Sequence, residues 1–148
     1  EQVAPEEALE RLRKALPLGL DVYEADSVPL RASALMASVT GFSYTLDTNL
    51  DAEALEERIE ALLSRSKIEL EREGKKNRRG GRRKTVVDVR PMLKRMAVRP
   101  GPQGARVDVE LRLVDSRGVR MRELLALLEI DPAGTRIVKR ATYLREEG

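Results

Sequence analysis

A run of ten residues, 75–84, holds the densest charge in the sequence. It contains seven cations, two glycines and no acid, and the cations are Lys75, Lys76, Arg78, Arg79, Arg82, Arg83 and Lys84. Without them the 28 basic residues would fall to 21 against 25 acidic ones, and the formal charge of +3 would become −4. Arginines in such a run can neutralise phosphates, contact them in bidentate geometry and stack on bases. The run therefore predicts a segment that binds RNA or another polyanion. A solvated surface loop and a contact for an acidic protein are the alternatives.

A carboxylate and a guanidinium follow this run at a spacing of two residues. Asp88 lies between Val87 and Val89, and Arg90 comes next before Pro91. Side chains alternate between the two faces of a strand, so Asp88 and Arg90 are expected on one face and the valines on the other. Such a pair could hold a phosphate, which adds Arg90 to the predicted nucleic-acid-binding residues, or it could poise Asp88 as a catalytic carboxylate. A structural ion pair is the alternative.

A segment of small residues, 33–38, could bring a partner close to the backbone. Leu35 and Met36 are its large side chains, and Ser33 and Ser38 bound it. These four residues form the predicted partner surface. The alternative is a tight helical turn that closes the end of the core.

The composition excludes several classes of site. The chain has no Cys and no His, so it can hold no disulfide, no structural zinc site of the usual ligands and no Ser-His-Asp triad. No glycine pattern of a nucleotide-binding loop is present. We therefore expect no metal, no cofactor and no catalysis by the chain alone.

No apolar run approaches the roughly 18 residues that would cross a bilayer, so we expect a cytoplasmic protein without a membrane partner. The oligomeric state is left open.

The hydrophobic pattern predicts an α+β chain. Helices are expected at 5–16, 33–37, 52–63 and 119–129, and strands at 20–28, 39–46, 67–71, 85–90, 92–98, 105–114 and 136–144. Asp51 should cap the third helix, Gly41 could form a bulge, and 74–84 should be an exposed loop. This order predicts antiparallel sheets with helices on one face, in ferredoxin-like halves. Residues 1–92 would form one half, whose first strand is missing, with the basic loop 74–84. Residues 93–148 would form a ββαβ half packed on it.

Four segments in a fixed order resemble a known bacterial family. They are 16–20 (LPLGL), 26–39 (DSVPLRASALMASV), 84–91 (KTVVDVRP) and 131–143 (DPAGTRIVKRATY). Together they resemble the radical SAM-linked protein family, a domain found beside or fused to cobalamin-binding radical SAM proteins. The resemblance implies a radical SAM protein as partner and a connection with RNA, and it transfers no catalytic residues. Members carry an N-terminal portion with a Gly-Phe-His-Pro-type motif that this chain lacks, and the chain begins at Glu1, so we expect a fragment or a processed product.

Three interpretations follow from these features. The first is a non-catalytic RNA-binding or substrate-presenting accessory domain that acts with a radical SAM protein in RNA modification or maturation. The second is a protein–protein adaptor domain in which the basic loop is incidental. The third is a remnant of an RNA-modifying enzyme with Asp88 as its carboxylate.

Overall fold

The computed structural model describes residues 3–31, 34–76 and 82–145, and it separates the chain into two units, Glu1–Ala34 and Leu35–Gly148. The first unit contains one helix, α1 (Pro5–Ala15), as predicted. Pro5 begins it, Glu6 and Glu7 lie in its first turn, and the guanidinium of Arg13 donates to the carbonyl of Val22 at 3.0 Å. The strand predicted at 20–28 is wrong, because this segment pairs with no strand of the described chain and stays irregular.

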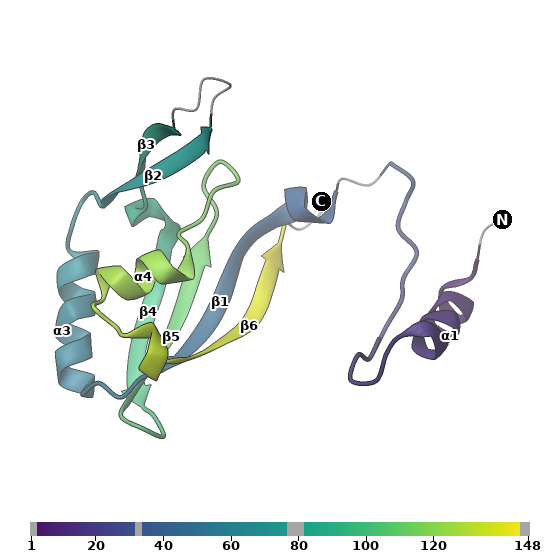
Figure 1. Cartoon of the computed structure of the whole chain (residues 1–148), viewed down its shortest axis with the longest axis horizontal. Helices are drawn as coiled ribbons and strands as arrows, with labels where there is room; N and C mark the ends of the chain where they lie inside the picture. The colour runs from purple at the N-terminus through teal and green to yellow at the C-terminus, as the bar shows by residue number, and fades with distance from the viewer. Residues whose placement is uncertain (1–2, 32–33, 77–81, 146–148) are drawn as a thin grey trace. The chain divides into compact units, whose positions relative to one another are not determined.

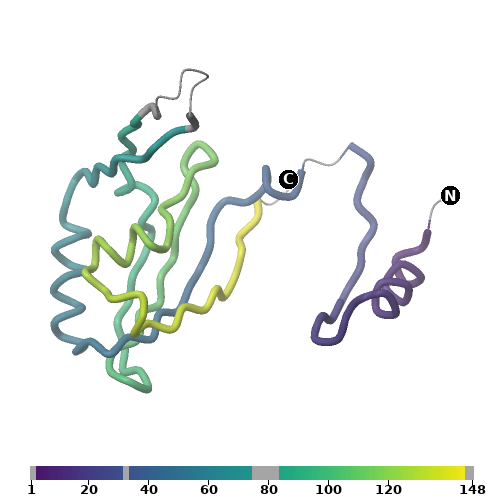
Figure 2. Tube along the Cα trace, in the orientation of Figure 1, coloured from purple at the N-terminus to yellow at the C-terminus, as the bar shows by residue number. Residues whose placement is uncertain are grey.

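The second unit is built on a four-stranded antiparallel sheet. Its strands are β1 (Val39–Asp47), β4 (Leu93–Pro100), β5 (Ala105–Arg112) and β6 (Arg136–Leu144), in the spatial order β4-β5-β1-β6. Figures 1 and 2 show β1 lying between two strands that come much later in the chain. The predicted bulge at Gly41 is confirmed, since the register between β1 and β6 shifts between Val39 and Gly41.

Two longer helices cover one face of this sheet. They are α3 (Ala52–Leu63), which follows β1, and α4 (Met121–Leu127), which follows β5; α2 (Leu35–Ser38) is a single turn before β1. Asp51 caps α3 as predicted and accepts from the backbone N–H of Glu53 at 2.9 Å. Apolar side chains of both helices join the apolar face of the sheet in one core, which includes Leu46, Leu55, Val107, Val109, Leu124 and Leu128. The order β1-α3-β4-β5-α4-β6 is the ferredoxin-like arrangement, so the predicted fold class is confirmed.

A separate two-stranded ribbon is inserted between α3 and β4. It consists of β2 (Glu69–Lys76) and β3 (Arg82–Asp88), and a short 3₁₀ turn, η1 (Arg90–Met92), leads from it into β4 (Figure 1). The loop predicted at 74–84 is therefore wrong at both ends, where the residues lie on strands. Pairing of the strand ends 74–76 and 82–84 through the backbone does not require apolar side chains, and the cross-strand pair of Lys84 with Glu71 at 3.1 Å favours it.

The stretches predicted as separate halves contribute to the same sheet. β1 belongs to 1–92, whereas β4, β5 and β6 belong to 93–148, and β1 pairs with both β5 and β6. The physical reason is that a strand with its following helix, such as β1 with α3 or β5 with α4, leaves an apolar face uncovered. The two units bury these faces together when their strands interleave in one sheet. A last 3₁₀ turn, η2 (Pro132–Gly134), leads into β6.

Candidate nucleic-acid interface

The face of the four-stranded sheet opposite α3 and α4 carries mostly charged side chains. Alternation along β5 buries Ala105, Val107, Val109 and Leu111 under the helices and turns Arg106, Asp108, Glu110 and Arg112 the other way. The register of the sheet places residues of β1, β4 and β6 on the same face. We call it the open face, and its charged members are Asp47, Lys94, Arg95, Arg99, Arg106, Asp108, Glu110, Arg112, Arg136 and Arg140.

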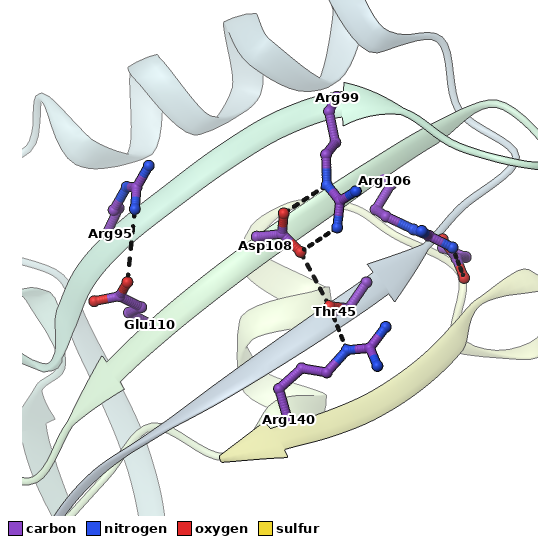
Figure 3. A network of polar contacts seen from close by, with 8 residues as sticks. Thr45, Arg95, Arg99, Arg106, Asp108, Glu110 and Arg140 are labelled. Carbon is purple, nitrogen blue, oxygen red and sulfur yellow. Dashed lines mark hydrogen bonds and ion pairs between the residues drawn. The ribbon is translucent and has the colours of Figure 1, made fainter. Parts of the chain in front are cut away.

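A row of hydrogen bonds crosses the open face from one edge of the sheet to the other. Arg99 on β4 donates to both carboxylate oxygens of Asp108 on β5, with Nε–Oδ2 and Nη2–Oδ1 distances of 2.6 and 3.1 Å. Thr45 on β1 donates from Oγ1 to Asp108 Oδ1 at 3.0 Å, and Arg140 Nε on β6 donates to Thr45 Oγ1 at 3.0 Å. Figure 3 shows this row, in which one residue from each of the four strands takes part.

An ion pair between Arg106 on β5 and Asp47 on β1 lies at the end of the sheet where β1 ends. Arg106 donates through Nε and Nη2 to the two carboxylate oxygens of Asp47, and the Nη2–Oδ2 distance is 2.9 Å. The hydrogen bond from Arg106 lowers the pKa of the Asp47 carboxyl, and the hydrogen bond from Arg99 likewise lowers the pKa of Asp108. Both carboxylates therefore stay ionised and hold their arginines in fixed positions.

The arginines of this layer keep donors for further contacts. A guanidinium carries five N–H groups. Arg99 and Arg106 each use Nε and Nη2 on a carboxylate, and Arg140 uses Nε on Thr45. Thr45 is only 2% exposed even though it belongs to the open face, so polar side chains lie over the strands. Each of these guanidinium groups therefore has N–H groups beyond those that the bonds to Asp108, Asp47 and Thr45 use.

The open face has an excess of positive charge. Its ten charged members comprise seven bases and three acids, which leaves a net charge of +4. The outer side of α3 carries the exposed acids Glu53, Glu56, Glu57 and Glu60. The formal charge of +3 thus combines the basic sheet face and the basic run at 75–84 with acidic regions such as α3.

A hollow of about 210 Å³ lies within the open face. It is lined by Ser43, Arg95, Asp108, Glu110, Arg140 and Tyr143, among others. Glu110 forms ion pairs with Lys94, at 3.0 Å, and with Arg95, at 3.7 Å, and the bond from Lys94 lowers the pKa of the Glu110 carboxyl. The hollow therefore combines an ionised acceptor, several donors and two tyrosines, Tyr44 and Tyr143.

The structure places the predicted basic residues on or near the ribbon. Lys75 and Lys76 lie on β2, Arg82, Arg83 and Lys84 lie on β3, and Arg78 and Arg79 lie outside the described residues. The ribbon is held to α4 by Arg72, whose guanidinium donates to both carboxylate oxygens of Glu123 at 2.9 and 2.6 Å and to the carbonyl of Gly118 at 2.8 Å. These contacts fix the base of the ribbon on the core.

The side chains of Asp88 and Arg90 both form hydrogen bonds with backbone groups. The Asp88 carboxylate accepts from the backbone N–H groups of Ile68 and Arg90 at 2.9 and 3.0 Å, and these bonds lower the pKa of Asp88. The Arg90 guanidinium donates to the carbonyls of Leu63 and Arg65, at the end of α3. Arg90 lies on η1 and not on the strand, so the two side chains do not form the predicted strand-face pair. The pair joins the base of the ribbon to α3.

The predicted partner surface lies beside a different hollow. Leu35 and Met36 on α2 are 67% and 70% exposed and line a space of about 340 Å³ with Val39, Phe42, Lys139, Thr142 and Leu144. The Lys139 ammonium lies 3.9 Å from the centre of the Phe42 ring. Ser38 donates to the carbonyl of Leu35 at 2.7 Å, and Ser33 lies outside the described residues. The site is apolar with one cation at its side.

The arginines of the open face were missed by reasoning from the sequence. The signal was present in β5, where charged residues alternate with apolar ones from Arg106 to Arg112. Alternation indicated a solvated face, but the four strands that supply the charges come from distant parts of the chain. Their charges could be added only after the strand order was known.

Fold and site define a ferredoxin-like α+β protein with an arginine-rich sheet face. A family model described as "Uncharacterized protein conserved in bacteria (DUF2344)" matches residues 1–122, and the chain belongs to this family. The comparisons with curated proteins and with solved structures found no match. No helix in the described ranges is long and apolar enough to cross a membrane. The link to radical SAM proteins stays a prediction.

Proposed function

We propose that the chain is a non-catalytic domain that binds single-stranded RNA on its open face. The observation that carries the proposal is the net charge of +4 on a sheet face opposite the two long helices. A sheet face of this kind can support an extended strand whose bases are unstacked, and its cations can neutralise the phosphates. The basic ribbon, which Arg72 holds to α4 on the helix side of the sheet, is a second place at which RNA could bind.

The fixed arginines favour binding for a second reason. Ordering a flexible side chain at an interface costs about 0.5–1.5 kcal/mol. Arg99 and Arg106 are already ordered by two hydrogen bonds each, and Arg140 is ordered by Thr45. Much of this cost is therefore met during folding, and the phosphate meets donors that already have a defined direction.

A salt titration of binding to a fluorescein-labelled ten-nucleotide RNA of mixed sequence tests the proposal. With about four phosphates neutralised, the logarithm of the association constant should fall with the logarithm of salt concentration at a slope near −3. The double variant Arg95→Ala/Arg140→Ala should reduce the magnitude of the slope by about 1.4, which is 0.7 for each lost contact.

Arg122→Ala is the matched control, because Arg122 lies exposed on α4 on the helix side of the sheet. It removes one arginine charge from outside the open face, where the double variant removes two from that face, and it should leave the slope unchanged. A wild-type chain without salt-dependent binding at low ionic strength would overturn the proposal. An unchanged slope in the double variant, together with a reduced slope in Arg82→Ala/Arg83→Ala, would assign binding to the ribbon instead.

An adaptor function is the second candidate, and the apolar hollow beside α2 favours it. Leu35 and Met36 are too exposed to contribute much to the core, and exposed apolar groups often mark a protein contact. Leu35→Ser/Met36→Ser should abolish capture of a protein partner without affecting the RNA titration. The family resemblance supports a radical SAM protein as that partner, which would supply the chemistry while this domain presents the RNA.

A further inference from the structure

We propose that the hollow between Glu110 and Tyr143 binds one unstacked guanine of the RNA strand. This inference rests on the proposed function and adds a base preference to it. Phosphate contacts position an RNA strand but carry no sequence information, whereas contacts to base edges do. The hollow brings together groups that can contact a base edge and a base plane.

The size of the hollow suits a single base. Its volume of about 210 Å³ is below the roughly 300–1,000 Å³ of clefts that hold drug-sized ligands. Tyr143 is 43% exposed and lines the hollow from β6, the edge strand. The Lys94 ammonium lies over its ring, 5.9 Å from the ring centre, so a base that stacks on Tyr143 would displace Lys94 or use the other ring face. Aromatic side chains stack on bases in this way in proteins that bind single-stranded RNA.

Glu110 supplies the acceptor that selects the base. Its Oε2 accepts from Lys94 at 3.0 Å, but its Oε1 is 3.7 Å from Arg95 Nη1, which is longer than a hydrogen bond. Figure 3 shows Arg95 and Glu110 facing each other across β4 and β5. An ionised carboxylate has about four acceptor positions, so Glu110 keeps acceptor capacity within the hollow.

Guanine matches this acceptor better than the other bases. Its Watson–Crick edge carries two adjacent donors, N1–H and the N2 amino group, which can bond to the two oxygens of one carboxylate. Adenine and cytosine each present a single amino donor on that edge, and uracil presents one N–H between two carbonyls. The carbonyls of uracil would face Glu110 and repel its charge. The guanine O6 acceptor could in turn accept from Arg95 or Arg140, which line the same hollow.

Binding of the labelled pentanucleotides UUGUU and UUUUU tests the inference. A good bidentate contact discriminates against a wrong base by roughly tenfold or more, so UUGUU should bind about tenfold tighter. Glu110→Gln keeps the size of the side chain but replaces one acceptor by a donor. It should bring the two affinities to within about twofold, while UUUUU binding stays the same or tightens slightly because a negative charge is lost.

Two variants of the tyrosine separate stacking from folding. Tyr143→Phe keeps the ring and should bind both pentanucleotides like the wild type. Tyr143→Ala removes the stacking face and should weaken UUGUU binding about tenfold or more. The circular dichroism spectrum and the urea midpoint check that each variant is folded.

The outcomes distinguish this inference from the proposed function. Equal binding of UUGUU and UUUUU with a normal salt slope would overturn the guanine site and leave RNA binding intact. A preference that survives Glu110→Gln would also overturn it. Loss of all RNA binding in the wild type would overturn both. GMP that competes as well as UUGUU would assign the hollow to a free nucleotide.

Discussion

The contact of Arg72 with Glu123 offers a sharp test of how the ribbon is held. Their side chains are 11% and 14% exposed, and Arg72 also donates to the carbonyl of Gly118. Removing one partner of a buried ion pair costs about 3–5 kcal/mol, because the other charge is left without compensation. Here the backbone N–H of Arg120, 2.8 Å from Glu123 Oε2, still supports the carboxylate. We therefore expect Arg72→Ala to lower the free energy of unfolding by about 3 kcal/mol.

Urea denaturation followed by circular dichroism measures this loss. For a domain with an m-value of about 1.5 kcal/mol/M, a loss of 3 kcal/mol moves the midpoint by about 2 M. Lys84→Ala is the control, because Lys84 pairs with Glu71 on the same ribbon and both side chains are more than 60% exposed. It should cost less than about 0.5 kcal/mol. If Arg72→Ala costs no more than Lys84→Ala, the ribbon is not held by this ion pair and the reasoning fails.

Two further predictions concern pH and backbone packing. Burial alone would raise the pKa of Glu123, but the bonds from Arg72 and from the N–H of Arg120 outweigh it and lower the pKa. The stabilisation that Glu123 provides is fully present above the pKa of the unfolded carboxyl, near 4.5, and is lost as the pH falls through the lower pKa of the folded carboxyl. Glu123→Gln should flatten that part of a pH–stability profile. Gly41→Ala should cost about 3 kcal/mol, because the added Cβ would lie 2.3 Å from the Leu111 carbonyl oxygen. At Gly134 the nearest atom is 3.6 Å away, so Gly134→Ala should cost much less, and thermal unfolding of the two variants provides the comparison.

The fold was predictable where local pattern and turn chemistry agree. Asp51 indicated the start of α3, and Gly101 and Gly104 indicated the turn between β4 and β5. The segment 20–28 has a strand-like pattern, but strand pairing depends on a partner that local sequence does not specify. The ends of β2 and β3 were mistaken for a loop because they lack apolar residues, although two strands can pair through their backbones without them.

The candidate site was less predictable, for a reason of distance along the chain. The hydrogen-bonded row from Arg99 to Arg140 links residues that are up to 95 positions apart, as in the contact of Arg140 with Thr45. Each residue alone reads as ordinary surface charge. The run at 75–84 was predicted as a binding segment because its charges are consecutive, and consecutive charges are visible in a sequence without knowledge of the fold.

The placement of the ribbon also bears on how this domain can vary. Its two ends meet at the core, where Val89 N–H donates to the carbonyl of Ile68 at 2.8 Å, and both of these residues are buried. A segment whose ends lie this close can be shortened, lengthened or exchanged without moving the strands on either side. The ferredoxin-like frame and its sheet register would therefore tolerate changes in length beyond the anchoring contacts of Arg72 and Asp88, between 73 and 84. The length and charge of the outer part of the ribbon could therefore change during evolution while the four-stranded sheet and its helices stay the same.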